Sequence, residues 1–137
     1  MRFILQAVII STVLFCMLGS CQQSTPNSFD PGRKIKIVAT TGMIADAIEE
    51  IVGDRGEVVA LMGPGVDPHL YKATQGDLQK LTDADIIFYN GLHLEGKMGE
   101  VFEKLGRMKP VIAVSSDIPE EELRAVPGFQ GTHDPHI

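Results

Sequence analysis

The chain has 137 residues, of which 44% are hydrophobic and 22% charged, and its formal net charge is −6 at neutral pH. This length and composition are typical of one globular domain with its own hydrophobic core. The excess of acidic residues argues against nucleic acid and anionic membrane surfaces as binding partners.

The first twenty residues differ in composition from the rest of the chain. Arg2 is their only charged residue, and the apolar run over residues 3–18 is shorter than a membrane-spanning helix requires. The run ends in Gly19-Ser20, directly before Cys21, which is the layout of a secretory signal peptide. We therefore predict a signal peptide over residues 1–20, and an uncleaved anchor helix is the alternative.

The residues Leu18-Gly19-Ser20-Cys21 resemble the bacterial lipobox, in which the cysteine becomes the acylated first residue of the mature protein. Cys16 would leave with the signal peptide, so the mature chain would have neither a free thiol nor a disulfide. A chance cysteine at this place is the alternative. The polar segment 21–33 predicts a flexible tether, and the folded domain is expected over residues 34–137.

From residue 34 onward, strand-like apolar runs alternate with segments of helical periodicity. We predict strands over 34–40, 58–62, 85–89 and 111–114, and helices over 43–52, 74–81 and 95–105. This alternation predicts an α/β fold with a four-stranded, mainly parallel sheet flanked by helices. The nearly unbroken apolar run at 85–89 predicts a strand that is buried on both faces. Thr74 and Asp77 have the spacing of a capping box.

The tripeptide Asp-Pro-His occurs twice, with its histidines at His69 and His136. His69 follows the second predicted strand and His136 lies downstream of the fourth, and ligands of parallel sheets bind at the carboxyl ends of the strands. Neutral imidazole is a good ligand for zinc, manganese or iron, and the proline restricts the backbone beside it. We predict that both histidines bind one metal ion. Asp67 and Asp134 are candidate partners of the second ring nitrogens; two ordinary Asp-Pro turns are the alternative.

Other polar residues give weaker signals. Glu95 is a further candidate for supporting the site, or else a favourable charge at a helix N-terminus. His93 is a loop or helix-start residue, and His133 is separated from His136 by Pro135, which prevents a helix that would align them. We predict no catalytic residues, because the chain lacks a Ser/His/Asp order and a glycine-rich phosphate loop.

Several segments together resemble the metal-binding lipoproteins of ABC importers, the cluster that carries zinc, manganese or iron. The resemblance covers residues 34–137 and rests on the segments 66–71, 77–78, 84–85, 90–95 and 134–137. It implies one lobe of a bilobal fold with the ion between the lobes, and His69 and His136 as the first two ligands. It also implies an extracytoplasmic protein, lipid-anchored at Cys21 to a bacterial membrane, with a permease and an ATPase as partners.

We expect this chain to lack the second lobe, which in the family would supply the third and fourth ligands. The tryptophan that usually follows the second histidine motif is missing as well, so the chain is expected to be an N-terminal fragment with weaker metal binding. In the family that the chain resembles, zinc-specific members often carry a histidine-rich acidic loop before the second ligand. Residues 119–131 contain no histidine, so the resemblance implies a receptor for manganese, or for both manganese and zinc, with iron as a further candidate. Two alternatives stay open: a zinc hydrolase with Glu95 as base, and a surface adhesin with incidental histidines.

Overall fold

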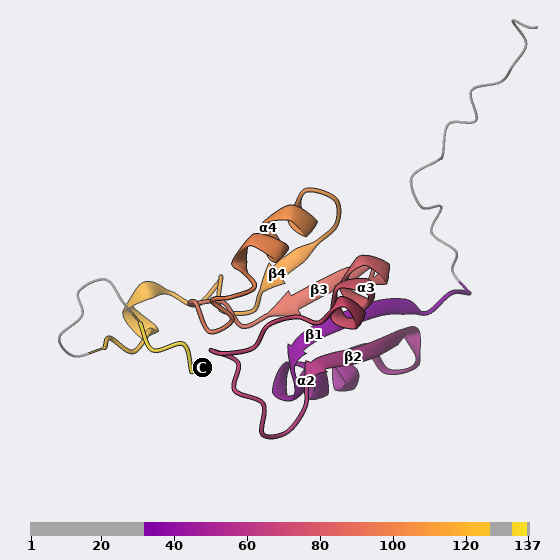
Figure 1. Cartoon of the computed structure of the whole chain (residues 1–137). Helices are drawn as coiled ribbons and strands as arrows, with labels where there is room; N and C mark the ends of the chain where they lie inside the picture. Colours follow the sequence, from indigo (N-terminus) through magenta and orange to yellow (C-terminus); the bar gives the residue numbers. More distant parts are fainter. Residues whose placement is uncertain (1–31, 127–132, 137) are drawn as a thin grey trace, which may run out of the picture. The chain divides into compact units, whose positions relative to one another are not determined.

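A four-stranded parallel sheet forms the centre of the structure. The computed structural model describes residues 32–126 and 133–136, so the predicted signal peptide, and Cys21 with most of the predicted tether, lie outside the described residues. The sheet consists of β1 (Ile35–Thr41), β2 (Gly56–Met62), β3 (Ile86–Tyr89) and β4 (Val111–Ala113), in the order β2-β1-β3-β4 (Figure 1). All three strand pairs are parallel, which confirms the predicted fold class.

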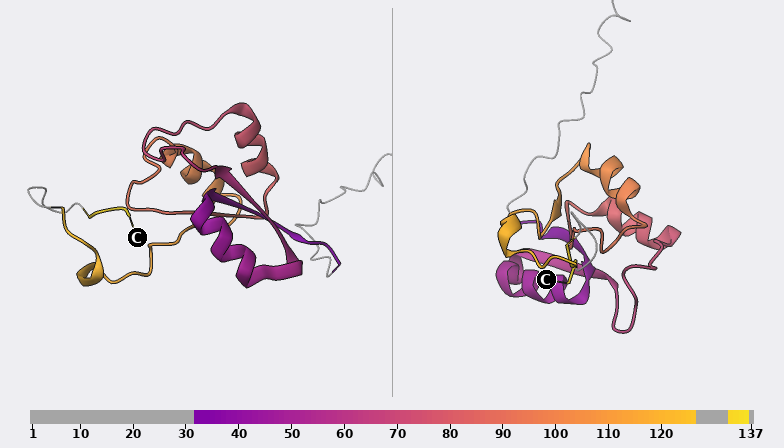
Figure 2. Two further views of the ribbon diagram at one scale, coloured as in Figure 1. Left: turned by 90° about the horizontal axis from the view of Figure 1, so that it is seen from below. Right: turned by 90° about the vertical axis from the view of Figure 1, so that its left-hand side faces the viewer.

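The helices lie on both faces of the sheet. α2 (Gly42–Val52) packs on β1 and β2, whereas α3 (Gln75–Asp83) and α4 (Gly99–Gly106) lie on the opposite face (Figures 1 and 2). Short 3-10 helices occur at Gly53–Arg55 and Glu120–Glu122. None of the helices in the described ranges is long and apolar enough to cross a membrane.

The main core lies between the sheet and the α3–α4 layer. Its buried members come from β1, β2 and β3, from α3 and α4, and from residues directly beside these helices: Val38, Leu61, Leu81, Ala84, Ile87, Met98, Phe102 and Leu105. Leu81 and Ile87 are both 0% exposed. Burial of such an aliphatic side chain contributes about 1.5–3 kcal/mol, so this core is the main source of the domain's stability.

The prediction that β3 is buried on both faces is only half right. Ile87 points into the core, but Ile86 and Phe88 on the other face are only half-buried. On that face α2 covers β1 and β2, and the neighbouring Ile112 of β4 is 39% exposed. The apolar run indicated a central parallel strand correctly, but the extent of burial depends on which helices cover the sheet.

The predicted helix over 95–105 begins later than its periodicity indicates. α4 starts at Gly99, and residues 92–98 form consecutive turns, with hydrogen bonds from Leu94 N to Gly91 O and from Met98 N to Glu95 O. Gly91, Leu92 and His93 all have positive φ, at 89°, 50° and 64°. This left-handed turn directs the Glu95 side chain back toward β3, so residue 95 does not start a helix.

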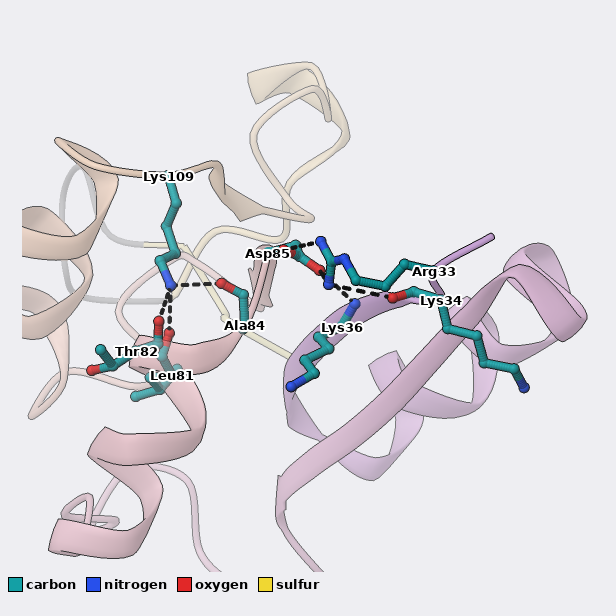
Figure 3. A network of polar contacts seen from close by, with 8 residues as sticks. All are labelled: Arg33, Lys34, Lys36, Leu81, Thr82, Ala84, Asp85 and Lys109. Carbon is teal, nitrogen blue, oxygen red and sulfur yellow. Dashed lines mark hydrogen bonds and ion pairs between the residues drawn. The ribbon is translucent and has the colours of Figure 1, made fainter. Parts of the chain in front are cut away.

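The predicted C-cap of α2 and the predicted capping box at the start of α3 are confirmed, whereas α3 ends at Asp83 rather than at residue 81. Thr41 caps α2, whose C-cap is Gly53 with φ 52°. Thr74 and Asp77 form the predicted capping box of α3, in which each residue accepts a hydrogen bond from the backbone of the other. At the opposite end of α3, Lys109 Nζ donates to three backbone carbonyls, those of Leu81, Thr82 and Ala84 (Figure 3).

A bidentate ion pair between Arg33 and Asp85 holds the start of β1. Arg33 donates two hydrogen bonds to Asp85, at 2.9 and 2.8 Å, and Lys36 N donates a third at 2.8 Å (Figure 3). The hydrogen bonds from Arg33 hold the pKa of the Asp85 carboxyl below its usual value. Arg33, the last residue of the predicted tether, therefore contacts Asp85 directly before β3.

Candidate metal centre

The first histidine lies on the loop that follows β2. Hydrogen bonds from Val66 N to Gly63 O and from Leu70 N to Asp67 O, both 3.3 Å, fold this loop into two turns. Asp67 Oδ1 accepts a bond of 2.9 Å from His69 N. Asp67 therefore holds the backbone of His69, and the predicted contact with the imidazole is replaced by this backbone contact. The His69 side chain itself lies at the exposed surface.

A second network holds the end of this loop against α3. Tyr71 Oη donates a 2.7 Å hydrogen bond to Asp77 Oδ2, which also accepts from the backbone and hydroxyl of Thr74. The hydroxyl of Thr74, followed by the other donors, lowers the pKa of Asp77 well below its usual range. Burial, together with the nearby Asp77 carboxylate, raises the pKa of Tyr71 to about 12. The sequence predicted the capping box of Thr74 and Asp77, but it did not predict the hydrogen bond from Tyr71 to Asp77.

The second histidine lies in the short described segment 133–136. Asp134 Oδ1 accepts a bond of 3.0 Å from His136 N and lies 2.7 Å from His136 Nδ1. The backbone N–H of His136, and then its ring, lower the pKa of Asp134. Asp134 thus has the predicted contact with its own imidazole. When His136 Nδ1 carries the proton donated to Asp134, its Nε2 presents a lone pair.

The two imidazoles meet at the carboxyl ends of the strands. His69 Nε2 and His136 Nε2 are 3.4 Å apart, and the ring planes are inclined at 63°. Two nitrogens bound to one tetrahedral zinc ion at 2.0–2.1 Å lie about 3.3 Å apart, which is close to the observed separation. Figure 2 shows the C-terminal segment returning to this end of the sheet. The distance suits either a direct hydrogen bond between the rings or a shared metal ion.

Among the described residues, His69 and His136 are the two candidate ligands that meet at this place. Within residues 32–126 and 133–136, no group of three or more His, Cys, Asp or Glu side chains could hold a metal ion. His93 is an exposed member of the left-handed turn, and His133 pairs with Ala125 in an isolated antiparallel bridge.

Glu95 is buried and forms its hydrogen bonds with the ends of two strands. Its carboxylate, on a residue that is 4% exposed, accepts hydrogen bonds from Thr40 Oγ1 at 2.6 Å and from Asn90 N at 2.7 Å. These donors stand at the ends of β1 and β3, where the order of the strands reverses direction and where ligands of such sheets bind. Glu95 therefore joins the two central strands, and Asn90, which the sequence indicated only as a turn residue, lies between Glu95 and the second histidine loop.

Known proteins are similar to this chain in sequence and in fold. Residues 37–137 match the family model described as zinc-uptake complex component A, periplasmic. The chain is 47% identical over 135 residues to the manganese-binding lipoprotein MntA of Bacillus subtilis, an alignment that covers 98% of this chain and 42% of that protein. It is 52% identical over 101 residues to the zinc-binding protein TroA of Treponema pallidum, covering 74% of this chain and 32% of that protein.

The fold agrees with the sequence comparisons. The solved structure of the periplasmic zinc-binding protein TroA from Treponema pallidum matches with a TM-score of 0.72 and 51% identity, over 76% of this chain and 37% of that one. The chain thus spans less than half the length of these relatives. Family model, sequence identity and fold agree, and the chain belongs to the family of periplasmic zinc-uptake complex component A proteins.

Proposed function

We propose that this chain is the N-terminal lobe of an extracytoplasmic solute-binding lipoprotein that captures a divalent transition metal for the permease of an ABC importer. The observation that carries the proposal is the 3.4 Å separation of His69 Nε2 and His136 Nε2 at the rim of the sheet. Family membership supports the functional class. Relatives of the chain are named as a manganese-binding lipoprotein, a zinc-binding protein and an iron ABC transporter substrate-binding lipoprotein.

The ion is the cargo, and manganese or zinc is the proposed cargo of this chain. His69 and His136 would each supply one imidazole nitrogen, and water would fill the remaining positions in this lobe. The His136 side chain is 67% exposed, so the ion can enter from solvent without a change in the core. Metal binding by this lobe is therefore expected to depend on both imidazoles.

The location of the protein forms part of the same proposal. Removal of residues 1–20 would expose Cys21 for lipid attachment, and the segment up to Arg33 would join the lipid to the folded lobe. The relatives MntA of Bacillus subtilis and PsaA of Streptococcus pneumoniae are named lipoproteins, which supports an anchored form. The ATPase and permease of the importer would be its partners.

The environment of Glu95 disfavours the alternative of a zinc hydrolase. A general base must reach a water bound to the metal, by direct contact or through one further water. The Glu95 carboxylate instead accepts hydrogen bonds from Thr40 and Asn90 in the interior. The buried carboxylate has a structural role, which leaves metal capture as the function that the two histidines support.

Metal titration of histidine variants tests the proposal. We expect Zn²⁺ and Mn²⁺ to bind the full chain with a one-to-one stoichiometry and His69→Ala to weaken binding by at least tenfold. His93→Asn is the matched control, because it removes an exposed histidine and asparagine tolerates the left-handed backbone at this position. Isothermal titration calorimetry measures both. Equal affinities of wild type and His69→Ala would refute the proposal, as would hydrolytic turnover that depends on zinc.

A further inference from the structure

The loop of the second histidine is joined to the sheet through Asn90, the residue that directly follows β3. Asn90 Nδ2 donates a 2.7 Å hydrogen bond to Pro135 O. This carbonyl belongs to the same planar peptide unit as the nitrogen of His136, so the bond fixes the plane from which the His136 Cα extends. Asn90 is 6% exposed and Pro135 is half-buried, so the bond is partly shielded from water.

The other backbone contacts of this segment are with its own neighbourhood in the sequence. Asp134 N donates to Arg124 O at 2.8 Å, and His133 forms an isolated bridge with Ala125. These contacts join the segment to residues that follow the 3-10 helix Glu120–Glu122, and not to the strands. Among the described residues, the bond from Asn90 therefore ties the backbone of the histidine loop to the end of the central sheet.

Asn90 is itself held from three directions. Its backbone N–H donates to Glu95 Oε1 at 2.7 Å, and the same oxygen accepts from Thr40 Oγ1 at 2.6 Å. The carbonyl of Asn90 accepts from Ser115 N at 3.2 Å, beyond the end of β4. Glu95 Oε2 lies 3.4 Å from the donor N–H of Gly91 and so holds the start of the left-handed turn. Both backbone groups and the side chain of Asn90 are thus engaged, and its amide has little freedom to move.

We propose that Asn90 is a positioning residue for His136, and that Glu95 acts one step further away by holding Asn90. Metal sites tolerate changes in ligand distance of only about 0.2 Å, so a loop that drifts by about 1 Å no longer places two imidazoles on one ion. Loss of the Asn90–Pro135 bond leaves the side chains of His136 and Asp134 in place, but it releases the peptide group between Pro135 and His136 from the sheet. This inference rests on the proposed function, because it assigns Asn90 a role only if both histidines bind the ion.

A double-mutant cycle in the full chain tests the inference. The probe is Zn²⁺ alone, and the readout is the shift of the His69 ring-proton resonances in NMR spectra, which measures weak as well as tight binding. Removal of an outer contact of a metal site typically costs 10–100-fold in affinity, and we expect Asn90→Ala to weaken zinc binding by about tenfold. In the His136→Ala background, Asn90→Ala should change the affinity by less than about twofold, because the residue that it positions is already gone.

Controls separate positioning from a general loss of stability. Leu105→Ala removes a core side chain of α4 that is 8% exposed and should lower stability without changing zinc affinity. If Asn90→Ala does not fold, Asn90→Ser takes its place, because a serine hydroxyl is too short to reach Pro135 O.

Each outcome of the cycle decides between the two proposals. Weakening by Asn90→Ala only when His136 is present supports the inference. Equal weakening in both backgrounds, no weakening at all, or equal weakening by Leu105→Ala overturns it. If His136→Ala itself leaves zinc affinity unchanged, the proposed function and the inference both fail. If His136→Ala weakens zinc binding but Asn90→Ala does not, only the role of Asn90 is refuted.

Discussion

The substitution Asp77→Ala tests how the first histidine loop is anchored to the domain. Asp77 is 7% exposed at the start of α3, and its Oδ2 accepts hydrogen bonds from Tyr71 Oη at 2.7 Å and from Thr74 N at 3.0 Å. Alanine removes this acceptor, but it leaves the hydrogen bond from the backbone N–H of residue 77 to Thr74 Oγ1 in place. The change therefore isolates the carboxylate from the rest of the cap.

The expected loss of stability follows from the contacts that disappear. The bond from the half-buried Tyr71 hydroxyl to a charged acceptor contributes about 1.5 kcal/mol. The reciprocal arm of the capping box, on the exposed Thr74, contributes about 0.5 kcal/mol, and an acidic group in the first helical turn about 0.5 kcal/mol. The partly exposed Lys80 pair adds little. We expect Asp77→Ala to lower the free energy of unfolding by about 2.5 kcal/mol.

Urea denaturation at two pH values checks this magnitude and its origin. The folded-state pKa of Asp77 is lowered, so its contribution is complete above the unfolded pKa of about 3.9 and is lost as the pH falls toward the folded pKa. The stability difference between wild type and variant should therefore shrink by about 1 kcal/mol between pH 4 and pH 3. Asp46→Ala on the exposed side of α2 is the control, with an expected change within about 0.5 kcal/mol. A difference that is no larger than that of the control, or that does not depend on pH, would refute the reasoning.

Two further substitutions test the second loop and the end of α3. Asp134→Ala removes the acceptor of the His136 ring, so zinc affinity should fall at least tenfold by calorimetry, and by more than with Asp67→Ala, which loses only a backbone contact; equal losses would contradict this role. Lys109→Met keeps the aliphatic stem but removes the ammonium group that caps the carbonyl end of α3, so urea denaturation should show a loss of about 1–3 kcal/mol with unchanged zinc affinity. A stability within about 0.5 kcal/mol of wild type would show that water replaces the ammonium group without cost.

The sequence predicted the order and type of the elements well because each carries a local signal. The apolar runs of β1, β2, β3 and β4 and the caps at Thr74 and Gly53 depend on neighbouring residues, and the structure confirms them. The start of α4 was predicted wrongly because the apolar period reaches back to Met98, whereas the chain forms a left-handed turn at Leu92 and His93 that places the Glu95 carboxylate at the end of β3. Periodicity does not register such a contact.

The sequence by itself determined the fold class and the repeated Asp-Pro-His motif, because strand periodicity, proline stiffness and the chemistry of imidazole are properties of adjacent residues. Only the tertiary structure decided which groups meet. The approach of His69 Nε2 and His136 Nε2 to 3.4 Å, the contact of Glu95 with Thr40, and the bond from Asn90 to Pro135 join residues 45 to 67 positions apart. Such contacts arise from the strand order β2-β1-β3-β4, which brings the ends of the strands to one edge and which no local pattern encodes.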